Sequence, residues 1–218
     1  MKTKMLEITP TILTDSFVEL KEMLKKAEDF CSYVQIDIMD GKFVPSKSIK
    51  ISDLVKVKTS LNLEVHLMVE NPLGVLDDFK RIKNIKRVIF HYEVKDRPIE
   101  VIGEIKSFGL EAGLAISPQT PVRKIKDLLG SVDSVLILSV NPGFYGSKFI
   151  PQTLRKIRLI RKMRSDIKIG LDGGIKLNNL SKILNYPLDY LCVGSAILKE
   201  GNAKKAFLEF KRLCQNKV

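Results

Sequence analysis

The chain has 218 residues, of which 44% are apolar, and its mean hydropathy is close to zero. This length suits one large domain or two small ones, with enough sequence to bury a sizeable core. No apolar run is long enough to cross a membrane, and the first residues lack the apolar core of a signal peptide, so we expect a soluble, cytoplasmic protein without membrane contact.

The formal charge is +12, from 37 Lys and Arg against 25 Asp and Glu. Such an excess can attract polyanions or small phosphorylated ligands. The basic residues are spread over every helix-like segment without a nucleic-acid-binding motif, which favours a solvated basic surface and no nucleic-acid partner. Cys31, Cys192 and Cys214 are widely spaced and lack a closely paired histidine, so we expect reduced thiols that serve in packing.

Strand-like and helix-like segments alternate along the whole chain. The strand-like segments are 8–13, 34–41, 61–69, 86–91, 111–116, 134–140, 167–171 and 190–193. The spacing of apolar residues predicts helices at 14–27, 52–57, 71–79, 99–108, 122–129, 151–164, 177–184 and 203–214. Eight such pairs of about 27 residues, without a linker, predict a single-domain α/β protein over residues 1–218, a closed parallel (β/α)8 barrel. An open doubly wound sheet usually has a glycine-rich first turn, and residues 9–12 contain no glycine.

The second predicted strand carries a charge where apolar residues dominate. Side chains alternate along a strand, so the apolar residues at 34, 36 and 38 share one face, while Gln35, Asp37 and Met39 share the other. Burying a carboxylate among apolar neighbours is costly unless it is paired, hydrogen-bonded or bound to a metal. Asp37 therefore needs a partner, and the carboxyl end of its strand is where a barrel collects catalytic groups.

A short set of polar residues lies near the predicted carboxyl ends of the strands. They are Thr11, Gln35, Asp37, His66, His91, Glu93, Ser117, Ser139, Asp172 and Ser195. A substrate between Asp37 and Asp172 could lose a proton on one face and regain one on the other, as inversion at a carbon requires. His66 shares the inward face, and an imidazole with two carboxylates is a plausible divalent-metal site that would stabilise an enediolate.

Other polar segments carry weaker signals. The second histidine, His91, has no further acid in register within residues 87–93, and we expect a structural or supporting role for it. Three glycine-bearing loops, at 141–146, 172–174 and 193–196, could bring backbone N–H groups close to a phosphate, as loops after strands seven and eight of barrels do. Residues 142–147 are also long enough to close over a substrate as a lid.

Seven short motifs follow one another along the chain. They are TPTIL at 9–13, DIMDGKFVP at 37–45, VHLMVENP at 65–72, VNPGF at 140–144, KFIP at 148–151, LDGGI at 171–175 and GSAI at 194–197. In this order the set resembles the ribulose-phosphate 3-epimerase family, nearly from end to end. The resemblance implies an isomerase with a TIM barrel that interconverts D-ribulose 5-phosphate and D-xylulose 5-phosphate through a metal-bound enediolate, and it favours a homo-oligomer.

The resemblance also implies roles by position. Asp37 would accept the proton and Asp172 would donate one, with these roles exchanged in the reverse reaction. His66, Asp37 and Asp172 would hold one divalent ion (Zn, Mn, Fe or Mg), and Gln35 stands where the family typically has a further histidine ligand. An amide oxygen there favours a harder ion over Zn²⁺, and it equally permits loss of the metal. The implied substrate contacts are Thr11, Met39, His66, Met68, Gly143, Phe144, Tyr145, Gly146, Gly173, Gly174, Gly194 and Ser195.

Three alternatives stay open on the sequence alone. The same chemistry could act on a related ketose phosphate such as allulose 6-phosphate, because Tyr145 stands where the family often has glycine and could reshape the pocket. A metal-free or catalytically impaired homologue could bind sugar phosphates only, as Gln35 suggests. A nucleic-acid binder is suggested by the net charge and by nothing else.

Overall fold

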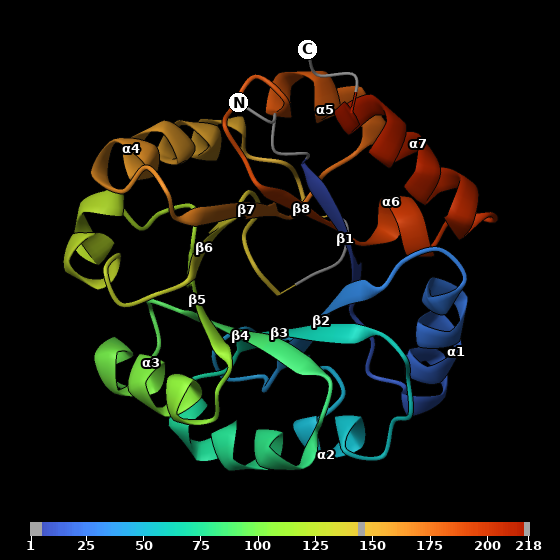
Figure 1. The fold of residues 1–218 in the computed structure, drawn as a ribbon, viewed down its shortest axis with the longest axis horizontal. Coiled ribbons are helices and arrows are strands. Elements are labelled where there is room, and N and C mark those ends of the chain that lie inside the picture. The colour runs from blue at the N-terminus through green and yellow to red at the C-terminus, as the bar shows by residue number, and fades with distance from the viewer. Residues whose placement is uncertain (1–5, 144–146, 216–218) are drawn as a thin grey trace.

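The computed structural model describes residues 6–143 and 147–215. Its strands form one closed parallel barrel in which β8 pairs with β1 (Figure 1). The strands are β1 (Glu7–Ile12), β2 (Tyr33–Met39), β3 (Asn62–Met68), β4 (Ile85–His91), β5 (Glu111–Ile116), β6 (Ser134–Leu138), β7 (Lys168–Asp172) and β8 (Tyr190–Val193). The predicted (β/α)8 barrel is confirmed, and each predicted strand lies within a few residues of its expected position.

Helical segments follow every strand and surround the ring (Figure 1). The α-helices are α1 (Phe17–Glu28), α2 (Ile51–Leu54), α3 (Pro98–Ser107), α4 (Arg155–Met163), α5 (Leu177–Ile183), α6 (Ser195–Leu198) and α7 (Ala203–Gln215). The remaining segments, η1 (Pro72–Arg81), η2 (Val122–Leu128) and η3 (Pro151–Leu154), are 3₁₀ helices. Apolar residues three apart fit either kind of helix, so the sequence pattern did not separate them.

The apolar core lies mainly between the ring of strands and the helices. Val34, Ile36 and Ile38 belong to this layer, so the predicted alternation along β2 is confirmed. A smaller cluster, which contains Tyr190, fills the inside of the barrel. A Cβ at Gly170 would lie 2.2 Å from the Tyr190 ring, so glycine is needed on β7 to let that ring fit.

A buried ion pair occupies the amino-terminal half of the barrel interior. Arg87 on β4 donates from Nη1 to Glu64 Oε2 on β3 at 2.7 Å and from Nε to Glu111 Oε2 on β5 at 2.8 Å. Glu64 and Arg87 are 0% and 3% exposed. Burial raises the pKa of Glu64 in spite of the neighbouring guanidinium. The pair therefore depends on both partners being present.

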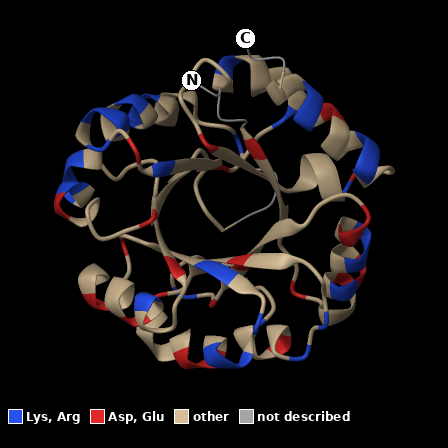
Figure 2. Ribbon diagram, viewed as in Figure 1, with Lys and Arg blue, Asp and Glu red and all other residues tan. Residues whose placement is uncertain are grey.

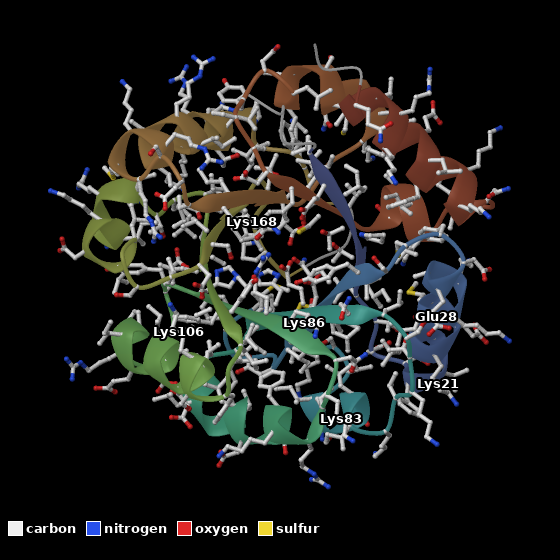
Figure 3. All side chains as sticks on the ribbon, in the orientation of Figure 1. Lys21, Glu28, Lys83, Lys86, Lys106 and Lys168 are labelled. Carbon is white, nitrogen blue, oxygen red and sulfur yellow. The ribbon has the colours of Figure 1, made fainter. Side chains whose placement is uncertain are left out.

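The net positive charge is distributed over the outside of the molecule. Figure 2 shows Lys and Arg on helices around the whole ring, and Figure 3 shows Lys21, Lys83 and Lys106 at its periphery. This distribution agrees with a solvated basic surface. Within the described part of the chain, no helix is both long and apolar enough to span a membrane.

Candidate active site

A pocket opens at the carboxyl ends of the strands, where the sequence predicts the site. Its lining includes the predicted residues Thr11, Asp37, His66, Met68, Gly143, Asp172, Gly173, Gly174, Gly194 and Ser195. Met39 lies outside the lining and packs with Val44 and Met68. Phe144, Tyr145 and Gly146 lie outside the described residues, so the expected lid is not placed.

Two acids and a histidine meet in the floor of this pocket. Asp37 and His66 are register partners on β2 and β3, and Asp172 ends β7. His66 Nδ1 lies 2.9 Å from Asp37 Oδ1 and 3.6 Å from Asp172 Oδ2. One ligand atom from each residue lies within 4.8 Å of the others. Since carboxylate and imidazole ligands stand at about 2.0–2.2 Å from a divalent ion, this spacing and this donor set fit a metal centre.

Gln35 is fully buried directly below the two acids. Its Nε2 donates to Asp172 Oδ2 at 3.0 Å and to Asp37 Oδ1 at 3.2 Å, while its Oε1 accepts from the Cys192 thiol at 3.0 Å. An amide nitrogen offers donors and no lone pair for a metal. In this orientation Gln35 ties the two carboxyl groups together, and the predicted metal-ligating oxygen faces away from them.

The surroundings of Asp172 and His66 move the pKa values of both groups away from their usual values. Burial and the adjacent Asp37 carboxylate raise the pKa of Asp172 to about 7. Burial acts to lower the pKa of His66, but the hydrogen bond and the charge of Asp37 outweigh it and raise that pKa above its usual value. Asp172 can therefore hold a proton near neutral pH.

His91 and Glu93 support His66 from behind. His66 Nε2 lies 3.0 Å from His91 Nε2, and His91 Nδ1 lies 3.2 Å from Glu93 Oε2. Glu93 is not in register with His91, but it lies just beyond the end of β4 and its carboxylate turns back to the ring, so His91 has an acidic partner that the strand pattern did not predict. Burial lowers the pKa of His91 to about 4. Burial would raise the pKa of Glu93, but hydrogen bonds from His91 and Thr120 bring it down to about 2.

Glycine loops form the rim of the pocket. Gly143, Gly173 and Gly174 have φ angles of 110°, 101° and 66°, a region that favours glycine. A Cβ at Gly173 would also lie 2.4 Å from Val140 Cγ2. The segment around Gly194 and Ser195, expected as a loop, continues directly into α6. These glycines leave backbone close to the pocket without side chains in the way.

Several lining residues are not among the predicted site residues. They are Leu13, Leu138, Val140, Pro142, Ser147, Ile175, Lys176 and Cys192. Lys176 directly follows the LDGGI motif, so extending that motif by one residue would have found it. Cys192 projects inward from β8, and the alternation along that strand is the signal that could have placed it.

The fold and this pocket define a (β/α)8-barrel protein with acid–base groups gathered at the carboxyl ends of its strands. Comparison of the sequence with protein-family models gives a match over residues 7–198 to the ribulose-phosphate 3 epimerase family. The chain therefore belongs to the ribulose-phosphate 3-epimerase family, as the order of its motifs predicted.

Relatives named ribulose-phosphate 3-epimerase match the chain over most of their length. The chain is 39% identical to ribulose-phosphate 3-epimerase of Methanocaldococcus jannaschii over 93% of this chain and 88% of the relative. It is 34% identical to ribulose-phosphate 3-epimerase of Escherichia coli over 94% of both chains. Among solved structures, orotidine 5'-phosphate decarboxylase of Pyrococcus horikoshii superimposes with a TM-score of 0.68 at 16% identity, over 96% of this chain and 99% of that one, and shows the fold alone.

Proposed function

We propose that this chain is an isomerase that interconverts D-ribulose 5-phosphate and D-xylulose 5-phosphate by inverting C3. The observation that carries the proposal is that the carboxyl groups of Asp37 and Asp172, from β2 and β7, meet in one pocket with His66 between them. Membership of the family and the names of the relatives support this reaction. They favour the pentulose phosphate over allulose 6-phosphate and a catalyst over a binding protein.

The two acids divide the proton transfer between them. Asp37, which accepts a hydrogen bond from Gln35 and lies 2.9 Å from His66 Nδ1, removes the proton from C3 on one face of the sugar. Asp172, whose pKa without metal is raised to about 7, delivers a proton to the opposite face. The reverse reaction exchanges the two roles. Gln35 Nε2 donates to both carboxyl groups and so links them.

We further propose that Asp37, His66 and Asp172 hold one divalent metal ion. The three ligand atoms, two hard oxygens and one imidazole nitrogen, suit Zn²⁺, Mn²⁺, Fe²⁺ or Mg²⁺. When bound there, the ion would act as a Lewis acid that stabilises negative charge on the substrate oxygens next to C3. Gln35 turns its amide nitrogen to the site, so the proposed set has three protein ligands, and the remaining positions stay open.

The other lining residues would bind and orient the substrate. Backbone N–H groups at Gly173, Gly174, Gly194 and Ser195 lie in the loops after β7 and β8, the usual place of the phosphate in a barrel. Thr11 and Met68 would line the sugar, with Gly143 on the rim. A cytoplasmic location and assembly into homo-oligomers stay predictions from the sequence.

Solvent deuterium incorporation tests the two-acid mechanism directly. Wild-type protein in D₂O should epimerise ribulose 5-phosphate and place deuterium at C3. Asp37→Asn and Asp172→Asn should each lose about 10²–10⁴-fold in epimerisation, the range for a general acid or base. Asp172→Asn should still exchange the C3 proton of ribulose 5-phosphate, because Asp37 remains.

Asp166→Asn is the matched control, since Asp166 is an exposed acid paired with Arg164. Its activity should equal that of the wild type. Full epimerase activity in either site variant, or no deuterium at C3 with the wild-type enzyme, would refute the mechanism. The same assay with allulose 6-phosphate should show slower turnover than with ribulose 5-phosphate.

A further inference from the structure

Four side chains form a continuous array that leads from the pocket floor into the barrel wall. Asp37 Oδ1 lies 2.9 Å from His66 Nδ1, and His66 Nε2 lies 3.0 Å from His91 Nε2. His91 Nδ1 lies in turn 3.2 Å from Glu93 Oε2. Both imidazoles are fully buried, so their hydrogen bonds go to one another and to the two acids. The position of the protons in this array is therefore set by its ends.

Glu93 can only accept at its end of the array. Its Oε1 accepts from the Ser117 backbone N–H at 2.9 Å and from the Thr120 hydroxyl. Lys156 Nζ donates to the backbone oxygens of Ser117 and Thr120 at 2.7 and 2.8 Å, and so holds this turn beside the carboxylate. These two donors and the nearby Lys156 ammonium group favour the ionised carboxylate. Its other oxygen, Oε2, faces His91.

The tautomer of His91 follows from this carboxylate. A neutral imidazole has one N–H donor and one bare nitrogen. With its proton on Nδ1, His91 donates to Glu93 and turns a bare Nε2 toward His66. With its proton on Nε2, it would set a bare Nδ1 against the carboxylate, where neither atom has a proton to share. His91 therefore carries its proton on Nδ1.

His66 must then donate from Nε2 to the bare Nε2 of His91. Its other nitrogen, Nδ1, is the one that faces Asp37 and Asp172, where a proton in the metal-free protein, or the metal when it is bound, lies between Nδ1 and the carboxylates. We propose that Glu93 is a positioning residue that acts through His91 to hold the Nε2–H of His66 and so leaves Nδ1 as the nitrogen that binds the metal. This inference rests on the proposed function, because it takes His66 as a metal ligand.

Replacing Glu93 by glutamine should reverse the direction of the hydrogen bonds along the array. The Ser117 N–H and Thr120 O–H still need an acceptor, so the amide oxygen should stay on their side. The amide NH₂ then faces His91 and donates to Nδ1, which moves the His91 proton to Nε2. His91 in turn donates to His66 Nε2, and the His66 proton is driven to Nδ1, where it blocks the metal-binding nitrogen.

Nitrogen NMR of the side chains tests this prediction, and the chain offers a simple spectrum because it has two histidines. The samples are full-length protein labelled with ¹⁵N-histidine, one without metal and one with added Zn²⁺ that is free of Mn²⁺. In both wild-type samples we expect the His91 proton on Nδ1. The zinc-loaded sample should show His66 protonated on Nε2. In Glu93→Gln the His91 proton should move to Nε2, and zinc affinity measured by calorimetry should fall about 10–100-fold.

Glu100→Gln is the matched control, because Glu100 is exposed on α3 and pairs with Arg97. It should change neither the tautomers nor the zinc affinity. A wild-type His91 proton on Nε2 would overturn the inference without any variant. So would a folded Glu93→Gln protein with the wild-type tautomers or the wild-type affinity. The His91 tautomer is read without metal or substrate, so its outcome is independent of the epimerase assay.

Discussion

At the scale of single residues, Asp172 shows how one environment can serve catalysis at a cost in stability. It ends β7 at 8% exposure and shares the pocket floor with Asp37. Burial and the charge of Asp37 raise its pKa from 3.8 to about 7. Without metal, Asp172 therefore holds a proton near neutral pH, and its ionisation works against the folded state.

This coupling predicts a pH-dependent stability difference between the wild type and Asp172→Asn, both without metal. A raised folded pKa means that the native state binds the proton more tightly than the unfolded chain. The contribution of Asp172 to stability is full below about pH 4 and is lost as the pH rises to about 7. Urea unfolding in chelator should show the wild type losing stability relative to Asp172→Asn over that interval. A difference that stays constant from pH 4 to pH 8 would contradict the assignment.

Gln35 illustrates the limit of reasoning from sequence at this scale. Alternation along β2 correctly placed it inward beside Asp37, but it cannot say which end of an amide faces the acids. That choice depends on Cys192, which comes from β8 and donates its thiol proton to the amide oxygen. Glu93 was among the polar residues expected near the strand ends, but its contact with His91 was not predicted, because Glu93 lies beyond the end of its strand, where alternation no longer fixes direction.

At the scale of elements, β3, β4 and β5 are joined by ion pairs inside the barrel as well as by backbone hydrogen bonds. Arg87 on β4 is 3% exposed and bridges Glu64 and Glu111 on its two neighbours. Removing one partner of a buried ion pair leaves the other charge without compensation. The side chain of Arg87 therefore matters for stability although it lies away from the pocket lining.

Arg87→Met should destabilise the protein by about 3–5 kcal/mol, because it leaves the Glu64 carboxylate buried and unpaired. Arg97→Met is the matched control, since Arg97 pairs with Glu100 at the surface, and it should cost no more than about 1 kcal/mol. Chemical denaturation of the three proteins measures both values. Adding Glu64→Leu to Arg87→Met should recover stability. Equal losses in the two single variants would count against a structural role for the buried pair.

The order of the elements was accessible from sequence because each strand is a short apolar run and each helix has an amphipathic face. The exact type of each helical segment was harder to predict. The segments of η1 and η2 were expected as helices without distinction between the α and 3₁₀ forms, and the short α6 was expected as a loop. In both cases apolar spacing reports which residues face the barrel, whereas the hydrogen-bonding pattern depends on the packing around it.

At the scale of the whole molecule, the candidate site depends on closure of the ring. β7 pairs with β6 and β8, and β2 pairs with β1 and β3, so Asp172 and Asp37 come from strands without mutual hydrogen bonds. The count of eight strand–helix units predicted that closure, and with it the meeting of the two acids. The net charge did not help to locate the candidate site, because the basic residues are spread around the periphery (Figure 2).

A ligand that binds side chains of β2, β3 and β7 together in the pocket should stabilise the closed barrel. A metal held by Asp37, His66 and Asp172 binds the folded chain and not the unfolded one, so at 100 times its Kd it adds about 2.7 kcal/mol. For a chain of this length, that corresponds to about 5–11 °C in Tm. Scanning calorimetry should show Tm falling by this amount on chelation and returning with added Zn²⁺ or Mn²⁺. In Asp172→Asn the shift should shrink strongly, because one ligand is weakened, and a Tm unaffected by metal in the wild type would refute the three-ligand site.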